Sequence, residues 1–460
     1  MLLAVALALF AANLALHFPG EMNPDATGQY LEVLSGRFTD WHPPVMAALW
    51  SLLRRIAEGP VTMLIYHLVL HWAGFALIAD SLLRQGRVRA AWLALAAGAF
   101  PLFLLFDGGI WKDVGMASAL LCAFALRRWY LSQDRRMPWA VGLLALALLA
   151  YGVLVRTNAV FAFGPLAVYA LGGRAGRAGA IRMTALALVL AVAMVPVSGW
   201  INRHLFDAES SGAMRSLQIF DMAGIARQTA GASAPLQTLT GQAAVDIERC
   251  YTPYWWDSFS PWGHCRQIWE QVAQTEQSTE GATGRAWLSA IAANPWAYAR
   301  HRLAHFNSML YFIVPADHYR FAPSLDGSAG TRPFSVKLLA VDFAKRNPLF
   351  WPMVWLVLGV GALAVTWRAK ADDDVAACRA LVLSGLLYTA AYLPIGVATS
   401  MRYHYWLMMS HLVALIIVFP HLLPALRARA RSVSLTAAAL LLVVLGGAAA
   451  RIFDLTFLVR

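Results

Sequence analysis

The sequence predicts an all-α protein that crosses a membrane about eleven times. Of its 460 residues, 59% are hydrophobic and only 13% are charged, and a soluble core cannot hold that much apolar surface. Long apolar segments recur along most of the chain, and lysine and arginine gather in short clusters between them. The net charge of +12 therefore fits a membrane protein, and it does not favour nucleic-acid binding because no single basic face emerges.

Eleven apolar segments reach or approach the length that a membrane-spanning helix needs. The first is expected to be a true helix rather than a cleaved signal peptide, because it has neither a basic start nor a small-residue cleavage site. Residues 45–56 are too short to span and are expected to lie on the outer surface as an amphipathic helix. The predicted spans are residues 2–18, 61–83, 90–106, 114–127, 138–155, 158–172, 181–200, 348–367, 375–395, 404–420 and 433–450.

The basic clusters predict the orientation of these spans, because lysine and arginine are enriched in cytoplasmic loops. If all the clusters face the cytoplasm, the N-terminus lies inside and the protein is a multi-pass membrane protein. The run Asp372–Asp374 also falls on the cytoplasmic side, where we expect it to be a solvated charge run. The clusters are Arg84–Arg89, Arg127–Arg136, Arg174–Arg182, Trp367–Lys370 and Arg427–Arg431.

The long polar stretch after the seventh span predicts an inserted external domain. We therefore expect a transmembrane module over 1–200 with its first external loop at 19–60, an external domain over 201–347, and C-terminal transmembrane helices over 348–460. Cys250 and Cys265 lie in the external domain, where an oxidising compartment favours a disulfide. A metal site is the weaker alternative, because no zinc-type His or Cys spacing accompanies the pair.

Several ionisable and aromatic groups fall on the external side in this topology. Ionisable groups beside apolar spans are costly unless they are paired, solvated or functional, so their convergence on one face indicates a site. Structural alternatives stay open: Lys112 and Asp113 could neutralise each other, Arg156 could anchor a helix end, and Tyr403 and Tyr405 could belong to an interfacial aromatic belt. The groups are Asp25 with His42, then Asp107, Lys112 and Asp113, then Arg156, and finally Arg402, Tyr403 and Tyr405.

An ordered set of short motifs runs through most of the chain: Pro24-Asp25 with Gln29-Tyr30, His42-Pro43-Pro44, Lys112-Asp113, Arg156-x-Asn158 and Arg402-Tyr403. In these motifs the sequence resembles the GT-C class of membrane glycosyltransferases, especially the bacterial members allied to protein O-mannosyltransferases and lipid A aminoarabinose transferases. The resemblance implies a seven-helix catalytic module, surface helices in the first external loop, a polyprenyl-phosphate sugar donor, and Asp25 as general base.

Two positions depart from these relatives. Aminoarabinose transferases present a lysine before their Pro-Pro, whereas this chain has His42, so a phosphate contact there depends on protonation. Asp25 stands alone rather than in the Asp-Glu pair of the mannosyltransferases, so a divalent metal is not indicated and no cofactor is expected.

Sugar transfer from a phosphate to a hydroxyl needs a base for the acceptor proton and cations for the departing phosphate. We expect Asp25 to be the base and Lys112 and Arg402 to bind the donor phosphate, with Arg156 and His42 as secondary candidates. One carboxylate that never attacks the sugar predicts inversion at the anomeric carbon. Candidate contacts to the sugar or the lipid head are Gln29, Tyr30, Asp113, Tyr403 and Tyr405.

The sequence therefore predicts an inverting glycosyltransferase that uses a polyprenyl-phosphate sugar and an acceptor hydroxyl on a glycan, lipid or protein at the outer membrane face. The alternatives are a transporter or flippase for a lipid-linked sugar, and a polymerase or ligase of surface polysaccharide. Transporters often show two related halves and ionisable residues at mid-membrane. The unequal blocks and the gathering of charge at one face favour the enzyme.

Overall fold

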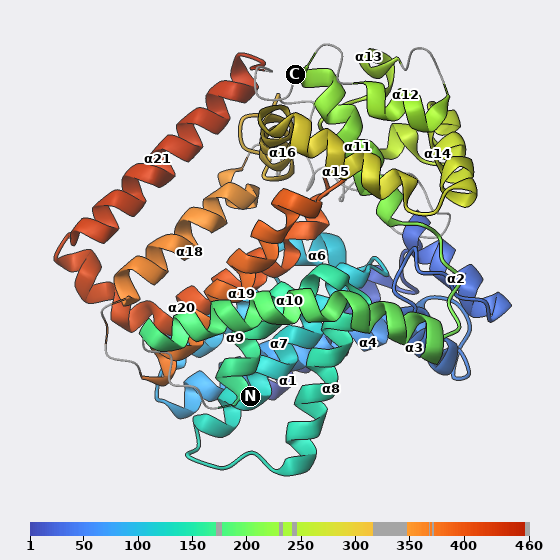
Figure 1. Ribbon diagram of the computed structural model, residues 1–460. Coiled ribbons are helices and arrows are strands. Elements are labelled where there is room, and N and C mark those ends of the chain that lie inside the picture. The colour runs from blue at the N-terminus through green and yellow to red at the C-terminus, as the bar shows by residue number, and fades with distance from the viewer. Residues whose placement is uncertain are drawn as a thin grey trace. The chain divides into compact units, whose positions relative to one another are not determined.

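The computed structural model describes residues 1–171, 177–229, 233–241, 246–315, 347–367, 369 and 372–455. Within these ranges the regular elements are helices, and no β-strand is present (Figure 1). The expectation of an all-α protein is therefore confirmed for this part of the chain. Residues 174–176, Arg368 and Lys370 of two predicted basic clusters, and residues 316–346 of the predicted external domain, lie outside the described residues.

All eleven predicted spans correspond to helical segments, but they differ in length and apolarity. Four are long and apolar enough to cross a membrane by themselves: Val61–Arg84, Asp373–Ile395, Met401–Arg427 and Arg431–Ile452. Two bent pairs raise the number to six if each pair is one span: Val88–Ala97 with Pro101–Asp107, and Thr184–Met194 with Pro196–Leu205. The described residues thus contain four to six candidate membrane-spanning helices. Leu2–His17, Trp139–Val155, Thr157–Ala170 and Pro352–Thr366 are apolar but shorter.

The chain divides into two compact units. The first comprises Met1–Glu209, the described residues of Phe321–Ala390, and Arg402–Leu442. The second comprises the described residues of Ser210–Arg320, Ala391–Met401 and Val443–Arg460. The division differs from the predicted three consecutive parts, because the C-terminal helices are shared between the two units rather than forming a part of their own.

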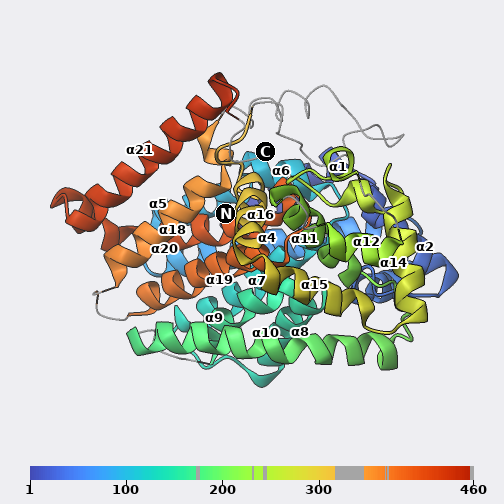
Figure 2. The ribbon, with the colours of Figure 1, turned by 45° about the horizontal axis from the view of Figure 1, so that its top comes forward.

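The first unit is built around α4, which packs along α7 and also contacts α1 and α5. α8 also packs on α7, α9 lies alongside α10, and α20 contacts α5, α7 and α18 (Figures 1 and 2). The helices that lie wholly or partly in this unit are α1 (Leu2–His17), α2 (Pro24–Ser35), α3 (Val45–Leu53), α4 (Val61–Arg84), α5 (Val88–Ala97), α6 (Pro101–Asp107), α7 (Lys112–Leu131), α8 (Trp139–Val155), η1 (Thr157–Ala159), α9 (Val160–Ala170), α10 (Arg177–Leu205), η5 (Pro348–Phe350), α18 (Pro352–Thr366), α19 (Asp373–Ile395), η6 (Met401–His404), α20 (Tyr405–Arg427) and α21 (Arg431–Ile452).

The predicted span 90–106 is broken into α5 and α6, which meet at 41°. Pro101 occupies the first turn of α6, a position where its missing N–H is tolerated. His71 of α4 bonds the freed carbonyl of Gly98 through Nε2 at 2.8 Å. The break is therefore stabilised by a buried side chain, as bent helices in apolar surroundings require.

In the acidic run at the start of α19, Asp372 and Asp373 are exposed as we expected, but Asp374 is not solvated. Asp374 is largely buried and accepts bonds from Arg87 Nη1 at 2.8 Å and from Arg128 Nη2 at 2.6 Å. These two arginines belong to two different predicted cytoplasmic clusters. Because buried arginines need a partner, Asp374 brings the start of α5, the end of α7 and the start of α19 together.

The second unit contains a group of shorter helices that lie in the sequence between α10 and α18. Cys250 and Cys265 are joined by the predicted disulfide, with a Cα–Cα distance of 5.9 Å, which closes a loop that contains Tyr254, Trp255 and Trp256. The helices of this unit are α11 (Met214–Gln228), α12 (Ala234–Thr240), α13 (Ile247–Cys250), η2 (Asp257–Phe259), α14 (Arg266–Ser278), α15 (Ala282–Ala293) and α16 (Pro295–Met309).

A buried polar network organises the core of the second unit. Asp221 of α11 accepts a bond from Trp287 Nε1 at 2.8 Å, lies 3.0 Å from His301 Nε2, and pairs with Arg302. Tyr251 bonds the other ring nitrogen of His301 at 2.8 Å. Asp221 and His301 are both fully buried, so the network ties α11, α15 and α16 together and is closed to solvent.

Hydrogen bonds over long sequence distances explain why two distant segments join this unit. Arg302 Nη1 donates to the Gly396 carbonyl at 2.6 Å, and the Trp256 N–H donates to the Val397 carbonyl at 2.8 Å. Arg451 of α21 donates to the carbonyls of Tyr311 and Phe312. These contacts hold the 391–401 segment and the second half of α21 in the second unit.

Candidate functional site

Asp25 lies in the first turn of α2, where the local sequence starts a helix. The Asn23 side chain accepts the Ala26 N–H at 2.9 Å and Pro24 occupies the first helical position, a standard N-terminal arrangement. A carboxylate in the first turn also interacts favourably with the helix dipole. Asp25 is therefore held on a short, well-capped helix rather than on a free loop.

Lys112 and Asp113 are the first two residues of α7. Backbone bonds between Glu21 and the loop before α7 bring this helix start beside the loop before α2: the Glu21 N–H donates to Gly108 at 2.7 Å and the Ile110 N–H donates to Glu21 at 3.1 Å. Asp113 suits a helix N-terminus, whereas a lysine there is unfavourable unless an anion is near. Lys112 at this position thus indicates that the site attracts negative charge.

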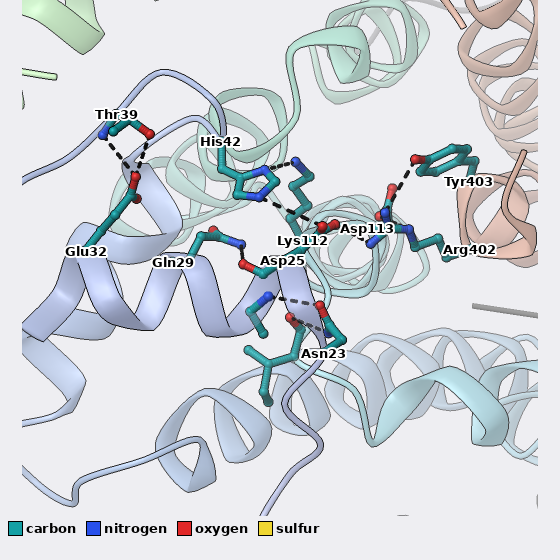
Figure 3. A network of polar contacts seen from close by, with 12 residues as sticks. Asn23, Asp25, Gln29, Glu32, Thr39, His42, Lys112, Asp113, Arg402 and Tyr403 are labelled. Carbon is teal, nitrogen blue, oxygen red and sulfur yellow. Dashed lines mark hydrogen bonds and ion pairs between the residues drawn. The ribbon is translucent and has the colours of Figure 1, made fainter. Parts of the chain in front are cut away.

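Arg402 and Tyr403 belong to η6, directly before α20, and Arg156 follows the end of α8. Figure 3 shows Arg402 and Tyr403 facing Asp25, His42, Lys112 and Asp113, which come from other helices and from the first loop. We call Asp25, His42, Lys112, Asp113, Arg156 and Arg402 the charged cluster. All six residues lie in the first unit.

Ion pairs connect the charged cluster. Arg402 Nη1 lies 2.6 Å from Asp25 Oδ2, and its Nε lies 3.7 Å from Asp113 Oδ2. Arg156 Nε lies 2.9 Å from the other oxygen of Asp113. Arg402 therefore bridges the two carboxylates, and Asp113 is shared by two guanidinium groups.

Aromatic rings orient the two arginines. The Arg402 guanidinium lies over the Trp111 ring at 4.1 Å from its centroid and 5.1 Å from that of Tyr403. The Arg156 guanidinium lies 4.5 Å from the Tyr403 centroid. Such cation–π contacts fix the planes of the guanidinium groups and leave their edges for planar, two-point contacts with oxyanions.

Burial and charge give His42 and Asp25 different protonation states. Burial, reinforced by the neighbouring Lys112 ammonium, lowers the pKa of His42 to about 3, so His42 is neutral at neutral pH and its Nδ1 lies 2.6 Å from Lys112 Nζ as an acceptor. Burial by itself raises the pKa of Asp25, but the attraction of Arg402 dominates and holds that pKa well below its usual range. Asp25 is therefore ionised, and His42 does not supply the positive charge that a direct phosphate contact would need.

The cluster carries one positive charge in excess, because three cations face two carboxylates while His42 is neutral. Its carboxylates differ in access. The Asp25 side chain is 28% exposed, whereas that of Asp113 is fully buried. Asp25 can thus meet a substrate directly, and Asp113 serves to hold Arg156 and Arg402.

The remaining predicted contact residues lie at different depths. Gln29 Nε2 donates to the Asp25 carbonyl at 3.2 Å, and Tyr403 contacts both arginines. Tyr30 instead accepts the Gly59 N–H at 2.9 Å and packs on Trp50, so it supports the first loop. Substrate contact remains a prediction for Gln29 and Tyr403, while the geometry gives Tyr30 a structural role.

Tyr405 takes part in a second, buried network. Its hydroxyl donates to Asp107 Oδ1 at 2.5 Å, and Asn13 Nδ2 donates to Asp107 Oδ2 at 2.8 Å. His71 Nε2 lies 3.8 Å from the same carboxylate. All four side chains are buried, so Tyr405 joins α20 to α1, α4 and α6 rather than facing a substrate.

Sequence reasoning missed Trp111 and Asn13. Trp111 directly precedes Lys112, but an aromatic residue at a span end is normally assigned to the interfacial belt. Asn13 carried a usable signal, because an amide inside an apolar segment needs a buried partner.

Among the described residues, no three His, Cys, Asp or Glu side chains converge as metal ligands do. No protein-family model matches the chain, and no curated protein and no solved structure is significantly similar to it.

Proposed function

We propose that the protein is an inverting glycosyltransferase of the GT-C type, which moves a sugar from a polyprenyl-phosphate donor to an acceptor hydroxyl at the outer face of a bacterial cytoplasmic membrane. The observation that carries this proposal is the charged cluster: one partly exposed carboxylate, Asp25, stands among three cations with one positive charge in excess. A phosphate ligand would neutralise that excess, and a carboxylate beside it is what acceptor deprotonation needs.

The proposed reaction forms a bond between the acceptor oxygen and the anomeric carbon while the bond from that carbon to the donor phosphate breaks. The acceptor proton passes to Asp25, and the bonding electrons leave with polyprenyl phosphate. Lys112 and Arg402 stabilise the negative charge that develops on the leaving phosphate, and Arg156 supports them through Asp113. Because the carboxylate never bonds to the sugar, one displacement inverts the anomeric centre.

We place all eleven helical segments across the membrane, with the charged cluster outside and the N-terminus inside. Lys112 and Arg128 stand sixteen residues apart on α7, about 24 Å along the axis at 1.5 Å per residue. Arg128 meets Arg87 at Asp374, so two clusters predicted to be cytoplasmic are joined at one end of α7 while the candidate site lies at the other. This arrangement supports opposite membrane sides for the two ends.

The test is donor cleavage by the purified full-length protein in detergent. A panel of short-chain polyprenyl-phosphate hexoses and pentoses is incubated with a lipid and glycan extract of the native envelope as acceptor. We expect release of polyprenyl phosphate from at least one donor and a product of inverted anomeric configuration. Mass spectrometry of surface glycans from cells with and without the protein then identifies the acceptor.

The matched control is Glu58→Gln, which removes an 83% exposed carboxylate from the same external loop. Donor cleavage should persist in this variant and be lost in Asp25→Asn. Movement of the intact donor across proteoliposomes without cleavage would instead identify a transporter, and cleavage that is equal in both variants would remove Asp25 from the chemistry.

A further inference from the structure

A groove of about 740 Å³ lies between α18 and the first half of α21, and none of its lining residues belongs to the charged cluster. These two segments lie side by side in both views (Figures 1 and 2). Met353, Val357 and Ala364 line the groove from α18, and Leu435 and Ala439 line it from α21. Its volume is within the range of about 300–1,000 Å³ that small-molecule sites occupy.

The two helices approach closely at one point and leave the rest of the groove open. A Cβ on Gly361 would lie 2.5 Å from Thr436 Cγ2, so the backbone of α18 touches α21 there. The buried residues of α21 are Val443, Gly447 and Ala450, all beyond its first half. Leu435 is 61% exposed and Val360 is 56% exposed, so the walls of the groove present apolar surface.

One end of the groove is basic. Arg431 and Ser432 line it at the N-terminus of α21, Arg427 is the last residue of α20, and Arg429 lies in the turn between the two helices. All three arginines are exposed, and none forms an ion pair with a carboxylate of the described residues. Positive charge at the end of an apolar groove is complementary to a lipid with an anionic head group.

The distance from the candidate site argues against the sugar donor as the occupant. α20 runs from Tyr405, three residues after Arg402, to Arg427, and a helix of its 23 residues is about 35 Å long at 1.5 Å per residue. A phosphate at Arg431 therefore lies a membrane thickness away from one at Arg402. An anion at Arg431 would therefore occupy a site separate from the charged cluster.

We propose that this groove binds a glycerophospholipid with an anionic head group, whose phosphate is held by Arg431 and whose acyl chain lies along α18. The residues that line the groove fit both parts of such a ligand: a guanidinium and a serine hydroxyl for the phosphate, and an apolar channel for the chain. The site is independent of the proposed glycosyl transfer.

The test measures lipid retention by the full-length protein. Delipidated protein in detergent is titrated with phosphatidylglycerol or phosphatidylcholine and analysed by native mass spectrometry. Three variants are compared: Arg431→Gln, which removes the head-group contact; Ala439→Phe, which fills the groove; and Arg135→Gln, a control at an exposed arginine in another basic loop. We expect selective retention of phosphatidylglycerol by the unaltered protein and by the control.

Arg431→Gln should weaken phosphatidylglycerol binding by about tenfold, as loss of a charge-assisted contact does. Ala439→Phe should abolish retention of both lipids at this site. Equal retention of the two lipids, or unchanged retention in both groove variants, would overturn the proposal. Displacement of the bound lipid by short-chain polyprenyl phosphate would assign the groove to the sugar donor. Displacement by dimerisation of the protein, in a dimer that Ala439→Phe abolishes, would assign it to a second copy of the chain.

Discussion

Asp25→Asn should separate donor binding from sugar transfer, and it should move them in opposite directions. The carboxylate contacts Arg402 at 2.6 Å, so in the resting site it competes with a donor phosphate for that guanidinium. Asparagine keeps the size of the side chain but removes its charge. The cluster's positive excess then rises from one to two, because Lys112, Arg156 and Arg402 face only Asp113.

The size of each effect follows from these contacts. Loss of a general base lowers transfer by about 10²–10⁴-fold. A hydrogen bond to a charged group contributes about 1.5–3 kcal/mol, but Asp25 is 28% exposed and solvent screens part of this competition. We therefore expect polyprenyl phosphate to bind Asp25→Asn about three- to tenfold more tightly, which corresponds to about 0.7–1.4 kcal/mol and lies just below that unscreened energy range.

Isothermal titration with a short-chain polyprenyl phosphate measures affinity, and single-turnover transfer measures chemistry. Glu58→Gln serves again as the control, since its exposed carboxylate lies in the same loop and should change neither quantity. Weaker phosphate binding by Asp25→Asn would refute the competition for Arg402. Near-normal transfer would refute the assignment of the base.

Arg402→Lys should bind polyprenyl phosphate more weakly than the unaltered protein in a titration, because an ammonium group cannot bridge two carboxylates and also offer a planar edge to the phosphate. An affinity equal to that of the unaltered protein would indicate that Arg402 acts as a simple point charge. His42 has a lower pKa in the folded protein than its ordinary value of 6.5, so its stabilising contribution falls as pH drops from about 6.5 towards 3, and His42→Gln should flatten the dependence of Tm on pH between about 5 and 6.5. Tyr405→Phe should lower stability by about 1–3 kcal/mol, because Asp107 loses a buried donor, yet leave the KM for donor unchanged; a raised KM would restore Tyr405 as a substrate contact. Serine at both Cys250 and Cys265 should destabilise the protein by about 3 kcal/mol, the value for a loop of 15 residues, before transfer is lost, and free thiols in peptide maps from native membranes would contradict the bridge.

Helix positions could be predicted well from apolar runs, because a helix satisfies the hydrogen bonds of its own backbone within an apolar segment. Only four to six of the described helices are candidates to cross a membrane by length and composition. The break between α5 and α6 was missed, although Gly98 and Pro101 signal it, because the run 90–106 remains apolar throughout. The unit boundaries were harder to predict. Single contacts such as that of Arg302 with the Gly396 carbonyl recruit a distant segment, and composition does not encode them.

For the candidate site, the topology expected from the sequence could put residues on the same side of the membrane, but it could not predict which of them form ion pairs. Counting spans from the basic clusters puts Asp25 and Arg402 outside together, yet 377 residues separate them and their ion pair depends on how α2, α7 and α20 pack. Patterns of apolarity set which face of a helix is buried, and they do not set which charged residue meets which. The sequence also allowed an ion pair between Lys112 and Asp113. In the structure, Lys112 instead contacts His42, and Asp113 forms ion pairs with the two arginines.

This exchange of partners changes the chemistry that each residue can perform. If Lys112 and Asp113 neutralised each other, Arg402 would have only Asp25 as a partner, and the excess positive charge would lie on Arg156 with no carboxylate to orient it. Because Asp113 is instead fully buried between Arg156 and Arg402, the guanidinium groups are already oriented when a phosphate arrives. Lys112 has a neutral imidazole as its hydrogen-bond partner, and although burial lowers its pKa to about 8, it is still mostly protonated at neutral pH and can meet an anion at the start of α7.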